Sequence, residues 1–120
     1  MNAPTKRELL ELAVHAAGLP YVKPAPEYDG RFGLEVGSEN PMRCWTWNPI
    51  DDDGDAFRLA AKLRIEIAYN EENKCVCRFW TNTKGFTAVA ERIGDDPCAA
   101  VRRAIVRAAA KIAESKGIES

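Results

Sequence analysis

The stretch WTWNPIDDDGDAFRLAAKL, residues 45–63, runs from an alternating aromatic pattern through an acidic turn into a helical pattern. Trp45 and Trp47 alternate with Thr46, which is typical of a half-buried strand. Asn48-Pro49 ends that strand, because proline has no N–H to donate to a sheet. The stretch therefore predicts a strand, a sharp turn and a helix, in this order.

The acidic run within this stretch is expected to begin the helix. Asp52 or Asp53 can cap it, because a carboxylate accepts hydrogen bonds from the free N–H groups of the first turn. The other carboxylates lie near the positive end of the helix dipole. The predicted apolar face contains Ala56, Phe57, Leu59, Ala60, Ala61 and Leu63.

Two patterns resemble metal sites without completing them. Asp51, Asp53 and Asp55 look like the start of a calcium loop, but its sixth and twelfth positions hold Ala56 and Lys62 in place of Gly and Glu. The cysteines are Cys44, Cys75, Cys77 and Cys98. Because the Cys-Val-Cys pair lacks the spacing of a structural zinc site, we expect reduced, mostly buried thiols, no metal and no cofactor.

Length and composition indicate one domain, spanning residues 1–120, with flexible ends at about 1–4 and 117–120. Apolar residues make up 46% of the chain and charged residues 29%, which argues against disorder. The net charge of −1 gives no general attraction to nucleic acid or anionic membranes. We find no apolar run long enough for a membrane helix and no signal peptide, so we expect a cytoplasmic protein.

The remaining chain reads as alternating helices and hairpins. Thr5-Lys-Arg-Glu8 is a capping box that opens a helix ending near Ala17. Alternating residues predict strands at 31–36, 42–47, 64–69 and 75–81, with a possible short strand at 86–91. Asp96-Pro97 opens the last helix, which Gly117 ends. This order, αββαββ(β)α, predicts an α+β fold with a mainly antiparallel sheet of four to five strands and three helices, packed on both faces of the sheet.

His15, the only histidine, lies four residues after Glu11 on the polar side of the first helix. We expect a solvated ion pair between them. A catalytic base is the alternative, but no nucleophile lies near it in sequence.

Three aromatic residues are candidates for contact with another protein. Tyr21 and Tyr28 lie in the proline-rich connector 19–30, which is expected to be extended, and they either form a contact surface or cover the core. Trp80 is expected to point away from Phe79, so it is either partly exposed or covered by a helix.

Cations line one side of the last helix: Arg102, Arg103, Arg107 and Lys111. Such a stripe can neutralise nucleic-acid phosphates. A solvated helix face is the alternative, favoured by the placement of Lys111 and Lys116 near the negative end of the helix dipole.

Two segments resemble the small phage and prophage proteins grouped as the phage α-β-α sandwich domain. They are WNPIDDDGDAFRLAAKL at 47–63 and DPCAAVRRAIVRAAAKI at 96–112. The matching positions are Trp47, Asn48, Pro49, Asp52, Asp53, Gly54, Asp55, Asp96, Pro97, Arg102, Arg103 and Ile105. The resemblance implies a three-layer α-β-α sandwich, a phage or prophage source and action inside the host cell. It supplies no catalytic residue.

We therefore carry two hypotheses of function. The first is a non-enzymatic phage accessory protein that binds a host or phage protein through exposed aromatic residues. The alternative is a nucleic-acid-associated phage protein that uses the basic stripe. An enzyme would require a pocket with perturbed titratable groups such as His15 or a cysteine. The sequence does not specify the oligomeric state.

Overall fold

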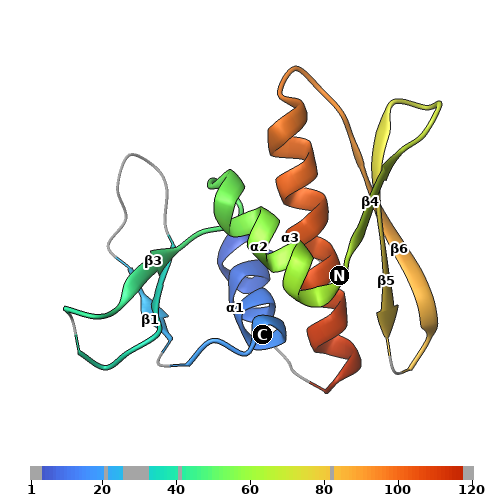
Figure 1. Ribbon diagram of the computed structural model, residues 1–120. Coiled ribbons are helices and arrows are strands. Elements are labelled where there is room, and N and C mark those ends of the chain that lie inside the picture. The colour runs from blue at the N-terminus through green and yellow to red at the C-terminus, as the bar shows by residue number, and fades with distance from the viewer. Residues whose placement is uncertain (1–3, 21, 26–32, 41, 82, 118–120) are drawn as a thin grey trace.

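The computed structural model describes residues 4–20, 22–25, 33–40, 42–81 and 83–117 (Figure 1). The helices are α1 (Lys6–Ala17), α2 (Asp53–Leu63) and α3 (Pro97–Ser115). The strands are β1 (Lys23–Pro24), β2 (Leu34–Val36), β3 (Trp45–Trp47), β4 (Glu66–Tyr69), β5 (Lys74–Thr81) and β6 (Gly85–Arg92).

The strands form two antiparallel three-stranded sheets, β1-β2-β3 and β4-β5-β6. The α+β class, the three helices and the antiparallel pairing are confirmed, and β6 confirms the short strand predicted at 86–91. The prediction of one sheet of four to five strands is wrong. Alternation along a strand indicates which face is buried, but it does not determine which strand pairs with it. Here the connector 19–30, expected to be extended, supplies the edge strand β1, which pairs with β2.

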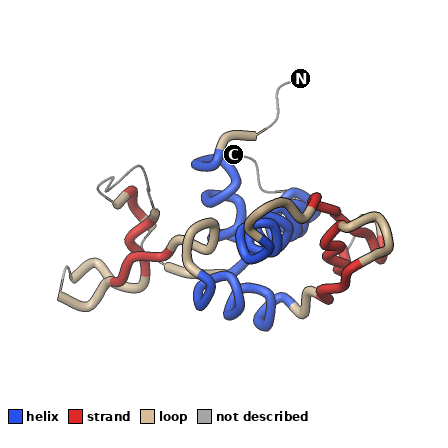
Figure 2. Tube along the Cα trace, turned by 90° about the horizontal axis from the view of Figure 1, so that it is seen from above, coloured by secondary structure: helices blue, strands red, loops and turns tan. Residues whose placement is uncertain are grey.

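The three helices lie between the two sheets (Figure 2). The sandwich that we expected has helices on both faces of one sheet, whereas here each sheet lies on a different side of the helices (Figures 1 and 2). α3 is at the centre and contacts α1, α2, β5 and β6. Its buried residues extend well beyond one stripe, and most of them are alanines. The buried residues of α3 are Ala100, Ala104, Ile105, Val106, Ala108, Ala109, Ala110, Ile112 and Ala113. Small side chains let neighbouring helices approach closely, so α3 packs on helices as well as on a sheet.

The helix starts are as predicted. Thr5 and Glu8 form a capping box, and Asp52 caps α2, its carboxylate accepting from the Asp55 N–H at 2.8 Å. Asp96 caps α3, with Pro97 at the first position. These starts are local, since a side chain satisfies N–H groups only two or three residues away.

Two finer predictions are corrected. Phe57 and Ala61, expected on the buried face of α2, are exposed, because that face is narrower than predicted and buries Ala56, Leu59 and Ala60. Glu11 pairs with Arg7, at 3.4 Å, and not with His15. Arginine reaches the next turn more easily than the shorter histidine.

Some predictions fall outside the described residues. These are Tyr21, the segment 26–32 with Tyr28, and the outermost residues of the two ends, 1–3 and 118–120. Within the described ranges, no helix is long and apolar enough to cross a membrane.

Candidate functional site

Trp80 and Phe86 form an exposed aromatic pair on the larger sheet. Along β5, Cys75, Cys77 and Phe79 are buried, so alternation turns Trp80 outward, where it is 58% exposed. Phe86 lies opposite it on β6 and is 73% exposed. The ring centroids are 5.2 Å apart and the planes meet at 81°, an edge-to-face contact. The predicted outward orientation of Trp80 is confirmed; its role stays a prediction.

The turn between β5 and β6 holds this pair in register. The buried Thr81 hydroxyl donates to the Gly85 carbonyl at 3.3 Å and accepts from the Lys84 N–H at 3.0 Å. Gly85 has φ +69°, a conformation that side chains disfavour. The turn therefore closes the β5–β6 ladder, in which Phe86 lies opposite Trp80.

A hollow of about 520 Å³ lies beside the pair, where the turn meets the C-terminal ends of α2 and α3. Its apolar lining comes from Leu63 and Ile112 together with the two aromatic rings. Its charged lining is cationic: Lys62, Arg64 and Lys116. These cations form no ion pair and no side-chain hydrogen bond with any residue that the structure describes. The site therefore combines apolar surface with three unpaired positive charges.

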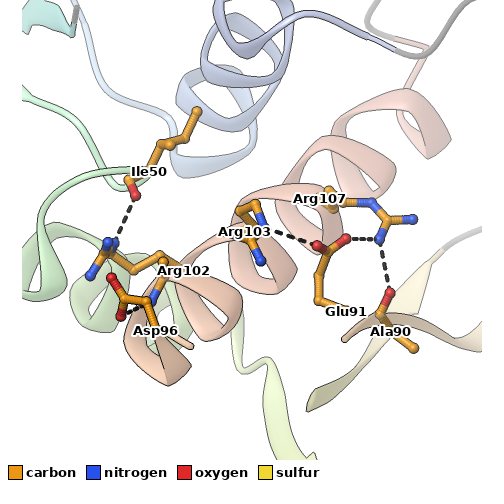
Figure 3. A network of polar contacts seen from close by, with 8 residues as sticks. Ile50, Ala90, Glu91, Asp96, Arg102, Arg103 and Arg107 are labelled. Carbon is orange, nitrogen blue, oxygen red and sulfur yellow. Dashed lines mark hydrogen bonds and ion pairs between the residues drawn. The ribbon is translucent and has the colours of Figure 1, made fainter. Parts of the chain in front are cut away.

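The predicted basic stripe is mostly engaged in contacts within the molecule (Figure 3). The Arg102 Nε donates to the Ile50 carbonyl at 2.7 Å, and its guanidinium pairs with Asp53. Arg103 donates to Glu91 at 3.0 Å. Arg107 pairs with the same carboxylate and donates to the Ala90 carbonyl at 3.0 Å. These arginines attach α3 to β6 and to the turn before α2.

Lys111, the last member of the stripe, is exposed and has no ion-pair partner among the described residues. It lines a second hollow with Lys84 and Glu114, next to Thr81. The residues of the stripe therefore have two different surroundings. The arginines contact acceptors within the protein, whereas Lys111 lies at the C-terminal end of α3, near the aromatic pair.

The cysteines differ strongly in environment. Burial raises the pKa of the Cys75 thiol, and burial together with the neighbouring Cys75 raises the pKa of Cys77 to about 12. Cys44 is half-buried and donates to Glu35 at 3.7 Å. Cys98 is exposed, contrary to the expectation of burial, because it lies in the solvent-facing first turn of α3. No group of three metal-ligating side chains is present in the described ranges.

A further hollow, of about 340 Å³, lies between α2, β4 and the start of α3. Its lining includes Phe57, Ile67, Tyr69, Val101 and Ile105. Ile67 and Tyr69 pair with the buried Cys77 and Cys75, so they point toward the helices, yet β4 is an edge strand and both remain exposed. Phe57, which was expected to be buried, lies exposed on this surface.

The cationic lining of the aromatic site could not be assembled from the sequence. Helical periodicity indicates only that Lys62 lies outside the apolar face of its helix, and alternation indicates only that Phe86 lies in a short strand. The available signal was that Lys62, Arg64 and Lys116 all lie where a helix ends, near its negative dipole end. What brings the ends of α2 and α3 to the β5–β6 turn is tertiary packing.

No model of a known protein family, no curated protein and no solved structure matches this chain.

Proposed function

We propose that this protein is a non-enzymatic binding module that contacts another protein through the Trp80–Phe86 pair. The observation that carries this proposal is the exposure of both rings, 58% and 73%, while Phe79, which precedes Trp80 on β5 and points to the opposite face of the sheet, is 1% exposed. Large aromatic side chains lose water-exposed apolar area when a partner covers them, and tryptophan is among the residues that contribute most to protein interfaces.

Binding is favoured over catalysis by the surroundings of His15 and of the buried Cys77. His15 is exposed on α1 and lines none of the hollows described above. The Cys77 thiol, with a pKa of about 12, is protonated near neutral pH and is therefore a poor nucleophile.

Protein contact is also favoured over nucleic-acid contact by the stripe. The side chains of Arg102, Arg103 and Arg107 are bound to acceptors within the molecule. Releasing them to phosphates would break these contacts, so the stripe makes a poor phosphate-binding surface.

The biological setting of the proposal is a phage or prophage accessory protein that acts inside the host cell on a host or phage protein. This setting rests on the resemblance of segments 47–63 and 96–112 to the phage α-β-α sandwich domain.

The test is site-specific photo-cross-linking in bacterial cells. A benzophenone amino acid placed at position 86 should cross-link to a defined protein. The same amino acid at Met42, which is 90% exposed on a loop distant in sequence, is the matched control. Trp80→Ala should remove the cross-link at position 86 while leaving the circular dichroism spectrum unchanged. Equal cross-linking at positions 86 and 42, or cross-linking to nucleic acid alone, would contradict the proposal.

A further inference from the structure

We infer that the partner inserts an acidic segment into the hollow beside Trp80, with one apolar side chain against the aromatic pair and carboxylates on Lys62, Arg64 and Lys116. The inference rests on the proposed function and specifies the chemistry of its partner. The hollow, about 520 Å³, has room for a large apolar side chain and adjoining backbone.

The first argument is the charge of the lining. None of the three cations has a partner among the described residues, and the hollow has no acidic residue in its lining. The neighbouring hollow adds Lys84 and Lys111 and one acid, Glu114. A partner with carboxylates at these positions would gain several charge-assisted contacts, whereas a basic segment would be repelled.

The second argument is the distribution of charge along α3. Asp95 and Asp96 lie at its N-terminal end, the arginines along it are paired with Asp53 and Glu91, and Lys111 and Lys116 lie near its C-terminal end. The acidic turn residue Glu71 follows β4, on the opposite end of β5 from Trp80. The basic charge is therefore concentrated at the end that carries the aromatic pair, so an acidic segment is attracted to the site and away from the other end.

The third argument is the backbone of Arg64. Arg64 caps the C-terminus of α2 with φ 55°, in the left-handed region. Glycine is the usual residue at this position, because a Cβ is unfavourable there. Arginine therefore occupies a position where the backbone alone favours glycine. Its side chain faces the hollow without a partner among the described residues, which points to a role in binding.

The arrangement of the rings favours a protein segment over single-stranded nucleic acid. Bases stack in succession on aromatic faces that are roughly parallel. Here the two ring planes meet at 81°, and the Trp80 ring also lies over Gly85. The pair therefore forms the wall of one hollow and not two successive stacking platforms.

The inference is tested with fluorescent probes on the full chain. One probe is a pool of short peptides in which Asp and Glu surround a single Leu or Phe. The second is the same pool with Lys and Arg in place of the acids, and the third is a labelled oligothymidylate. Fluorescence anisotropy should show binding of the acidic pool, weakening as salt rises, and little binding of the other two. Equal binding of the acidic and basic pools, or binding of the oligonucleotide alone, would overturn the inference.

Two variants make the test specific. Lys62→Glu combined with Lys116→Glu should weaken binding of the acidic pool by roughly tenfold or more, while Lys6→Glu, a matched reversal at the start of α1, should leave it unchanged. Arg64→Gly should weaken binding by about threefold, yet raise the melting temperature, because the left-handed backbone then carries no Cβ. Unchanged affinity in both variants would overturn the inference.

The two proposals fail in different ways. If a protein cross-links at position 86 and is still captured by the Lys62→Glu, Lys116→Glu variant, the binding module stands and the acidic segment is wrong. If no protein cross-links at position 86, the binding module itself is wrong. Where a protein does cross-link at position 86, mass spectrometry of the cross-linked peptide shows directly whether its sequence is acidic.

Discussion

Asp55 is the residue that joins the turn after β3 to the first turn of α2. It is 7% exposed. One carboxylate oxygen accepts from the Asn48 N–H at 2.9 Å, and the other accepts from Arg58 at 2.8 Å. The three aspartates of the acidic run therefore have different contacts. Asp52 caps α2, Asp53 pairs with Arg102, and Asp55 accepts a hydrogen bond from the backbone before the turn.

Replacing Asp55 by alanine should lower the free energy of unfolding by about 2–3 kcal/mol, because a part-buried N–H of Asn48 would lose its acceptor. Urea denaturation followed by tryptophan fluorescence measures this. The matched control is Asp95→Ala, at an exposed position, which should change stability by no more than about 0.5 kcal/mol. Equal midpoints for the two variants would show that the bridge does not stabilise the fold.

The buried thiols predict a loss of stability at alkaline pH. Folding raises the pKa of Cys77 from its ordinary value of 9.0 to about 12, through burial first and the neighbouring Cys75 second. Above pH 9.0 the unfolded chain releases this proton while the folded chain keeps it, so stability falls as pH rises from there to about 12. The free energy of unfolding of a Cys77→Ala variant should depend less on pH over this window. The same slope in both proteins would contradict the assignment.

At the scale of elements, α3 is held by arginines of unequal burial. The Arg102 side chain is 16% exposed and links α3 to Ile50, 52 residues away in sequence. The Arg103 side chain is 47% exposed and pairs with Glu91 on β6. A hydrogen bond from a mostly buried guanidinium to a backbone carbonyl contributes more to stability than an exposed ion pair.

Arg102→Ala should therefore destabilise the protein by about 2 kcal/mol, since the Ile50 carbonyl would lose a charged donor. Arg103→Ala, the matched control on the next position of the helix, should cost less than about 1 kcal/mol, as is usual for exposed ion pairs. Chemical denaturation of both variants measures the two losses in the free energy of unfolding. A larger loss for Arg103→Ala would mean that the contact with β6, and not the contact with the turn, holds α3 in place.

The sequence predicted elements better than their assembly. Thr5, Asp52 and Asp96 indicate helix starts because capping depends on residues close in sequence. The pairing of β1 with β2 depends on a long connector closing back on a short strand, which alternation does not encode. The contacts of Arg102 and Arg107 likewise depend on the packing of α3, so a surface stripe and a set of internal links look the same in sequence.

At the scale of the whole molecule, the two sheets on either side of the helices differ in size. β1, β2 and β3 have two or three residues each, whereas β5 and β6 have eight. α3 contacts β5 and β6 directly and contains a long run of buried residues. Strands this short give few hydrogen bonds to break, so the smaller sheet is expected to open more easily than the larger one.

Native-state hydrogen exchange should therefore separate the two halves of the molecule. Amides of α3 and β5 should exchange only through global unfolding, so their free energy of opening should equal the free energy of unfolding found by denaturation. Amides of β2 and β3 should exchange through local opening, with a lower free energy of opening. Val106→Ala provides the critical comparison, because Val106 is fully buried in α3 and its truncation should cost about 1–3 kcal/mol. Protection in α3 and β5 should fall by that whole amount, whereas protection in β2 and β3 should hardly change. A uniform fall across both sheets would mean that the protein opens as one cooperative unit, because the smaller sheet would then depend on the same packing as α3.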